Sequence, residues 1–232
     1  MKKTLGLLVT IWFLSYSVFA QDGCSMYYPM EKGTSFEYTN YNKKGKVEGV
    51  TSYSVVSVIS EGSATKATLY LKLLDKKGEE SFNTSYSYTC EDNMVRIDYK
   101  SLFPAAMMKQ YESMGLEMEI SGNDIEVPNN LSVGKELKDA NVTVNMNMSG
   151  MNMSISVDMT NRKVIAKENI TTETGTYECY VLSENTTSKT MGANIEMSSK
   201  LWLSKGVGMI KQETYKKNGD LMSRTELTKF HK

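Results

Sequence analysis

The side chains best suited to chemistry in this sequence are methionines. Residues 146–153 read MNMSGMNM, and the four methionines are Met146, Met148, Met151 and Met153. If Ser149 and Gly150 form a two-residue turn, all four thioethers lie on one face of a hairpin, where such soft ligands suit Cu(I). The same face continues into Val144 and Ile155, which cannot bind a metal. The pattern therefore favours an apolar wall and assigns no metal, with Cu(I) binding as the minor alternative.

Histidine chemistry is nearly excluded. The one histidine, His231, is next to the last residue, where a side chain is rarely held in place. Ser-His-Asp and Cys-His catalysis and His-ligated zinc all need a positioned imidazole. The chain also has no Gly-rich phosphate loop and no Cys-x-x-Cys motif, and its carboxylates show no spacing that nominates a catalytic pair. These observations predict a non-enzymatic protein without a cofactor.

The N-terminus has the features of a secretory signal. Lys2 and Lys3 precede an apolar run at residues 5–13, and the small-residue pattern before a cleavage site ends at Ala20. The run is shorter than the ~20 residues of a membrane-spanning helix. We therefore expect cleavage after Ala20 and a periplasmic or secreted protein without a transmembrane segment. The 27 basic and 27 acidic residues balance, which argues against a nucleic-acid partner.

Three cysteines cannot all pair within one chain. Cys24 follows QDG rather than the Leu and small residues of a lipoprotein signal, which argues against lipid anchoring there. Cys179 alternates with Tyr177 and Val181 on one strand face, so it is expected to be a buried free thiol. A disulfide between Cys24 and Cys90 is the preferred hypothesis, although sequence does not decide the connectivity.

The rest of the chain resembles a series of β-hairpins. Runs rich in Thr, Tyr, Val and Ser are separated by Lys/Asn/Gly turns at residues 42–45, 75–78 and 217–220. In the methionine hairpin, the expected partners are Met148 with Met151, Met146 with Met153, Val144 with Ile155, and Val142 with Val157. A one-residue slip would expose every apolar side chain, so this register is strongly specified. The predicted fold is mainly β, an antiparallel meander of about eight to eleven strands forming a curved or partly closed barrel.

One segment has helical spacing. Between Ser101 and Gly115 the apolar residues recur at intervals of four, four and three, which predicts a short amphipathic helix packed on the sheet. Its apolar stripe consists of Phe103, Met107, Tyr111 and Met114. No linker is visible, so we expect a signal peptide at residues 1–20 and one β-rich domain at residues 21–232.

Three motifs resemble landmarks of an uncharacterised secreted family of Bacteroidetes, called TapB-like. They are PMEKGTSFEY at residues 29–38, TGTYECY at 174–180 and WLSKGVGMIK at 202–211. The resemblance covers almost the whole mature chain. It implies a periplasmic protein with an open β-barrel similar to the LolA and LppX lipoprotein carriers, and it brings no catalytic residues.

Two functions fit this sequence. If the helix covers the concave side of a curved sheet, the methionines of the hairpin and the stripe of the helix would line an apolar pocket for a lipid or other apolar ligand. If helix and sheet instead pack tightly, the protein would act through its surface on an envelope protein partner. Both require the same pattern of apolar and polar residues, so the alternatives stay open.

Overall fold

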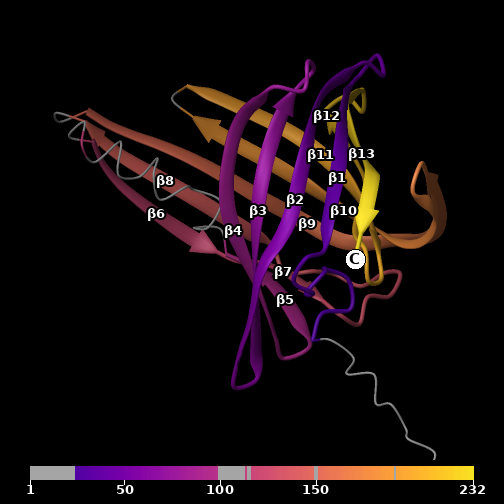
Figure 1. The fold of residues 1–232 in the computed structure, drawn as a ribbon. Coiled ribbons are helices and arrows are strands. Elements are labelled where there is room, and N and C mark those ends of the chain that lie inside the picture. The colour runs from indigo at the N-terminus through magenta and orange to yellow at the C-terminus, as the bar shows by residue number, and fades with distance from the viewer. Residues whose placement is uncertain (1–23, 99–112, 114–115, 149–150, 191) are drawn as a thin grey trace, which may run out of the picture.

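The computed structural model describes residues 24–98, 113, 116–148, 151–190 and 192–232. These residues form one antiparallel sheet of 13 strands (Figure 1). The strands are β1 (Ser35–Asn42), β2 (Val47–Glu61), β3 (Ala64–Asp75), β4 (Glu80–Glu91), β5 (Met94–Ile97), β6 (Leu116–Asn123), β7 (Ile125–Pro128), β8 (Ala140–Met148), β9 (Met151–Thr172), β10 (Gly175–Thr190), β11 (Ala193–Ser204), β12 (Gly208–Lys216) and β13 (Leu221–His231). The expectation of an antiparallel β fold is confirmed.

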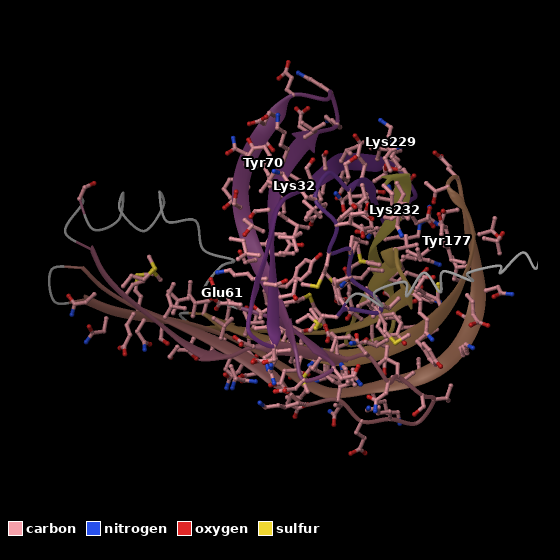
Figure 2. All side chains as sticks on the ribbon, turned by 60° about the horizontal axis from the view of Figure 1, so that its bottom comes forward. Lys32, Glu61, Tyr70, Tyr177, Lys229 and Lys232 are labelled. Atoms are coloured by element: carbon pink, nitrogen blue, oxygen red, sulfur yellow. A yellow bond between two sulfur atoms is a disulfide. The ribbon has the colours of Figure 1, made fainter. Side chains whose placement is uncertain are left out.

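The sheet curls into a nearly closed barrel. Its strand order is β6-β8-β9-β10-β11-β12-β13-β1-β2-β3-β4-β5-β7, so the edge strands β6 and β7 are neighbours in the sequence. The first and last strands, β1 and β13, pair with each other in the middle of the sheet. Viewed along the barrel in Figure 2, strands carrying Tyr70 and Tyr177 lie on opposite sides of the ring. One part of the sheet extends away from this ring, and we call it the wing. It consists of β6, β8 and residues 151–159 of β9.

The predicted turns are confirmed, and their chemistry explains their positions. Gly45, Gly78 and Gly219 have φ values of 71°, 83° and 86°, which glycine adopts without strain. The side chain of Asn42 accepts hydrogen bonds from the backbone N–H groups of Lys44 and Lys46. Such Asx contacts stabilise tight reversals between adjacent strands.

The predicted register of the methionine hairpin is confirmed at all four pairs. β6 adds a third strand, in which Met118 lies opposite Met146. The strand count exceeds the expected eight to eleven. β5 and β7 have only four residues each, too few for alternation to identify them.

The predicted amphipathic helix is not confirmed. Apart from Ser113, the segment between Ser101 and Gly115 lies outside the described residues, and every named element of the described residues is a strand. No helix in the described part of the chain is long and apolar enough to cross a membrane. The proposed signal segment, residues 1–20, also lies outside the described residues.

The first described residues are tied to the sheet by a disulfide and by hydrogen bonds. Cys24 forms the expected disulfide with Cys90 of β4, with a Cα–Cα distance of 5.8 Å. The buried Asn129 side chain donates to the Cys24 carbonyl at 2.6 Å and accepts from the Met26 N–H at 2.9 Å. Cys179 is buried and unpaired, as expected. The disulfide and Asn129 together hold the N-terminal segment against the sheet.

Candidate functional site

The interior of the barrel contains a cavity of about 320 Å³, which we call the central cavity. One wall is aromatic and comes from β1, β2 and β4. Its members are Phe36, Tyr38, Tyr53, Tyr86 and Tyr88. Alternation along each strand sends these rings to the same face, because cross-strand partners share a face. The pair Phe36 and Tyr53, directly opposite in the register, confirms this arrangement.

The rings of this wall contact one another. Phe36 and Tyr53 stack with ring centroids 5.0 Å apart, and Tyr38 meets Tyr53 edge-to-face at 5.6 Å. Tyr86 lies 6.1 Å from Tyr53 and 6.4 Å from Tyr88. Such edge-to-face and stacked pairs add to the stability given by burial alone. The wall is therefore a rigid apolar surface rather than a set of independent side chains.

The hydroxyl groups of this wall stay protonated and neutral. Burial raises the pKa of Tyr53 to about 12, and burial followed by neighbouring phenols raises the pKa of Tyr38 and Tyr86 well above the ordinary value. Tyr28 also lines the cavity, and burial raises its pKa to about 12. The Tyr88 hydroxyl donates a hydrogen bond to the Pro29 carbonyl.

The opposite wall comes from β9, β10 and β11. It combines apolar side chains with one ion pair. Arg162 Nε lies 3.2 Å from Glu184 Oε2, and Glu184 Oε1 accepts a hydrogen bond from Ser199 at 3.3 Å. Met159, Leu182 and Leu201 supply the apolar part. The cavity therefore has an aromatic side and an opposite side that carries the Arg162–Glu184 ion pair.

A β-bulge directs Arg162 into the cavity. Between the cross-strand pairs Thr160–Asn185 and Lys163–Ser183, β9 has one residue more than β10. Asn161, in this stretch of β9, has a φ of 55°. Asparagine is among the residues that tolerate this left-handed conformation. Without the extra residue, plain alternation from Met159 would bring Asn161 inward in place of Arg162.

Arg162 also links β9 to the edge strand at the other end of the sheet. Its Nη1 donates to the Lys138 carbonyl at 2.5 Å, and both terminal nitrogens lie 3.5 Å from the Glu126 carbonyl of β7. β9 is thereby linked to the edge strand β7, with which it shares no backbone ladder. The side chain is only 4% exposed, so its charge depends on these partners and Glu184.

The described methionines that were expected to bind a ligand lie outside the central cavity. Met146 and Met153 line a shallow groove on the wing together with Met118, outside the central cavity. Met148 and Met151 continue this row in the register. Phe103, Met107, Tyr111 and Met114 lie outside the described residues. Ligand binding by this set stays a prediction.

Sequence reasoning missed the central cavity. The signal was present in the alternation of Phe36 with Tyr38 and of Tyr86 with Tyr88, which is typical of an inward strand face. Arg162 and Glu184 carried no such signal, because a bulge decides their orientation. In the described part of the chain, no group of three or more His, Cys, Asp or Glu side chains is placed to hold a metal ion.

Comparison with known proteins gives both a family and a fold. A family model described as DUF3108-like matches residues 31–227. A solved structure of a Bacteroides fragilis protein, described as exported and as having a YmcC-like fold, superimposes with a TM-score of 0.71 at 17% identity over 90% of this chain and all of that one. A Parabacteroides distasonis protein described as a lipoprotein gives 0.71 at 22% identity, over 90% of this chain and 99% of that one. The search of curated proteins finds no match. The TapB-like name and the likeness to LolA and LppX are not confirmed.

Proposed function

The chain belongs to the DUF3108-like family, and from that premise we propose that it is a non-enzymatic binding protein that holds an apolar or amphipathic small molecule in the central cavity. The observation that carries this proposal is the cavity itself. Its volume of about 320 Å³ falls at the lower end of the range for small-molecule sites, ~300–1,000 Å³. A mostly apolar lining with a few convergent polar groups is typical of such sites.

The central cavity is a better candidate than the methionine face of the wing. Its aromatic wall is preformed by ring contacts, so a ligand would order few side chains on binding. The groove beside Met118, Met146 and Met153 is shallower and more polar, with Asn145, Asn147 and Asn152 among its lining. The wing retains the copper alternative, supported by three methionines directly opposite one another on adjacent strands.

The cell envelope is the location that best fits this function. The Cys24–Cys90 disulfide requires an oxidising compartment, and the two similar solved proteins are described as exported or as a lipoprotein. We expect cleavage after Ala20 and no lipid on Cys24, because a sulfur in a disulfide cannot also carry a thioether-linked lipid.

The proposal is tested by native mass spectrometry of protein purified from its own envelope without detergent exchange, followed by solvent extraction. We expect a reproducible added mass of an apolar compound. Leu201→Trp, which fills the cavity from β11, should lower its occupancy at least tenfold. Lys200→Trp, at the preceding and exposed position of the same strand, should leave the occupancy unchanged.

Two results would overturn the proposal. One is an unliganded mass in every preparation together with no uptake of the neutral fluorophore N-phenyl-1-naphthylamine. The other is equal loss of the bound compound in both tryptophan variants. Either would favour the alternative, a surface-interaction or envelope-assembly module.

A further inference from the structure

We infer that the ligand of the central cavity is an electrically neutral amphiphile, with an apolar body and a hydroxyl or carbonyl group, and that the Arg162–Glu184 pair disfavours molecules of net charge. This inference rests on the proposed function. It names the chemical class of ligand from the charge and hydrogen-bonding capacity of the walls.

The charges in the wall cancel. Among the described residues that line the cavity, Arg162 and Glu184 are the charged ones, and they contact each other at 3.2 Å. Arg162 also donates to the carbonyls of Lys138 and Glu126, and the second oxygen of Glu184 accepts from Ser199. Each ion thus already has a counter-ion in the wall, and the pair offers a charged ligand no net opposite charge.

A charged ligand would therefore lose its water without gaining a counter-ion. A carboxylate placed beside Arg162 would also lie beside Glu184, and an ammonium beside Glu184 would lie beside Arg162. Burying an ion without net compensation is far more costly than burying a hydroxyl that forms a hydrogen bond. Displacing Glu184 from Arg162 would leave Glu184 as the uncompensated ion instead.

Neutral polar groups have partners in this cavity. A protonated phenol both donates and accepts a hydrogen bond. In the described part of the chain, the hydroxyls of Tyr28, Tyr38, Tyr53 and Tyr86 form no hydrogen bond with another described residue. They are available to a hydroxyl, ester or ketone. The faces of the same rings supply contact area for an aliphatic chain or ring system.

The inference is tested by competition between ligands of equal chain length. The wild-type protein is loaded with N-phenyl-1-naphthylamine, which carries no charge, and titrated at pH 8 with dodecan-1-ol, dodecanoate and dodecyltrimethylammonium. We expect the alcohol to displace the fluorophore at a concentration at least tenfold lower than either ion.

A charge variant gives a second, independent readout. Glu184→Gln keeps the shape of the side chain and leaves Arg162 as an uncompensated cation. Its affinity for dodecanoate should rise at least tenfold, with little change for the alcohol. Glu178→Gln is the matched control, because this residue lies on the same strand with its side chain 66% exposed and paired with Lys167. Urea unfolding of both variants confirms that they are folded before binding is compared.

The outcomes separate the two proposals. If the wild-type protein binds neither the fluorophore nor any of the three competitors, the proposed function itself fails. If the fluorophore binds but dodecanoate competes as well as the alcohol, the protein is a binding protein and the neutral-ligand inference is wrong. If Glu184→Gln is folded and its preference is unchanged, the ion pair does not set specificity and the inference is likewise wrong.

Discussion

Arg162 of β9 and Glu184 of β10 form an ion pair at 3.2 Å in which the arginine side chain is only 4% exposed. The pair sits on the wall of the cavity, and the same guanidinium contacts the carbonyl of residue 126 in the edge strand β7 and the carbonyl of residue 138. Ligand recognition and closure of the barrel thus share one side chain.

Removing this arginine should destabilise the fold strongly. Arg162→Met leaves the half-buried Glu184 without its counter-ion and removes a donor from two carbonyls, so the loss should approach ~3 kcal/mol, the lower end of the cost of breaking a fully buried pair. Urea unfolding followed by circular dichroism measures the loss. Lys167→Met is the control on the same strand, because its pair with Glu178 is exposed to solvent and should contribute little to stability. Equal losses in the two variants would contradict the structural role of Arg162.

The disulfide should stabilise the barrel through its unfolded state. Cys24 and Cys90 close a loop over a sequence separation of 66 residues. The double variant Cys24→Ser, Cys90→Ser should lose about 2–4 kcal/mol of unfolding free energy in urea.

Intact mass spectrometry of the mature wild type should give the mass of residues 21–232 less two hydrogens, without a lipid. A mass that includes an acyl group would refute the assignment of Cys24.

Cys179 should be unreactive while the protein is folded. Burial, followed by the nearby carboxylates of Glu168 and Glu178, raises the pKa of its thiol to about 12. The nucleophilic thiolate is therefore scarce at pH 8. A chromogenic disulfide reagent should label one thiol in urea and almost none in buffer, over the same period. Immediate labelling of the folded protein would show that the thiol is accessible.

Stability should fall at alkaline pH. The folded pKa of Tyr28 and of Tyr53 is raised from 10.0 to about 12, so between these values the unfolded chain releases protons that the folded protein retains. The unfolded state then binds fewer protons than the folded state, and the free energy of unfolding decreases as pH rises. The stabilisation that the two buried phenols contribute is therefore fully present below pH 10 and is lost as the pH rises toward 12. Urea midpoints at pH 8, 10 and 11, with phenolate absorbance followed in parallel, test this. An unchanged midpoint up to pH 11 would contradict the burial of these phenols.

The methionine row should behave as an apolar surface. Met118, Met146 and Met153 lie opposite one another on adjacent strands, and the row continues into valine and isoleucine. Met146→Leu preserves volume and should change the unfolding free energy by less than ~1.5 kcal/mol.

Titration of the wild type with Cu(I) against a chelating competitor should show no site that binds one copper ion per protein. A site that appears in the wild type and is lost in Met146→Leu would establish the copper alternative.

The local architecture could be predicted from single segments. The register of the methionine hairpin follows from alternation on both sides of a two-residue turn, and the turns ending at Gly45, Gly78 and Gly219 follow from residues suited to tight reversals. The disulfide could only be preferred among the possible pairings, because its partners are 66 residues apart. The short strands β5 and β7 escaped prediction for lack of a periodic pattern.

What the sequence determined by itself is the antiparallel β character, the turns and the register of the methionine hairpin, because alternation and turn chemistry act between residues that are close in the chain. The tertiary structure decided where the site lies. The cavity exists because β1 pairs with β13 and thus brings Tyr38 and Tyr53 round to face the strands that carry Leu201 and Glu184. Arg162 points inward because a bulge shifts the alternation of β9 by one residue. Neither the long-range pairing nor the bulge has a signature within one segment, since each depends on the partner strand against which the chain packs.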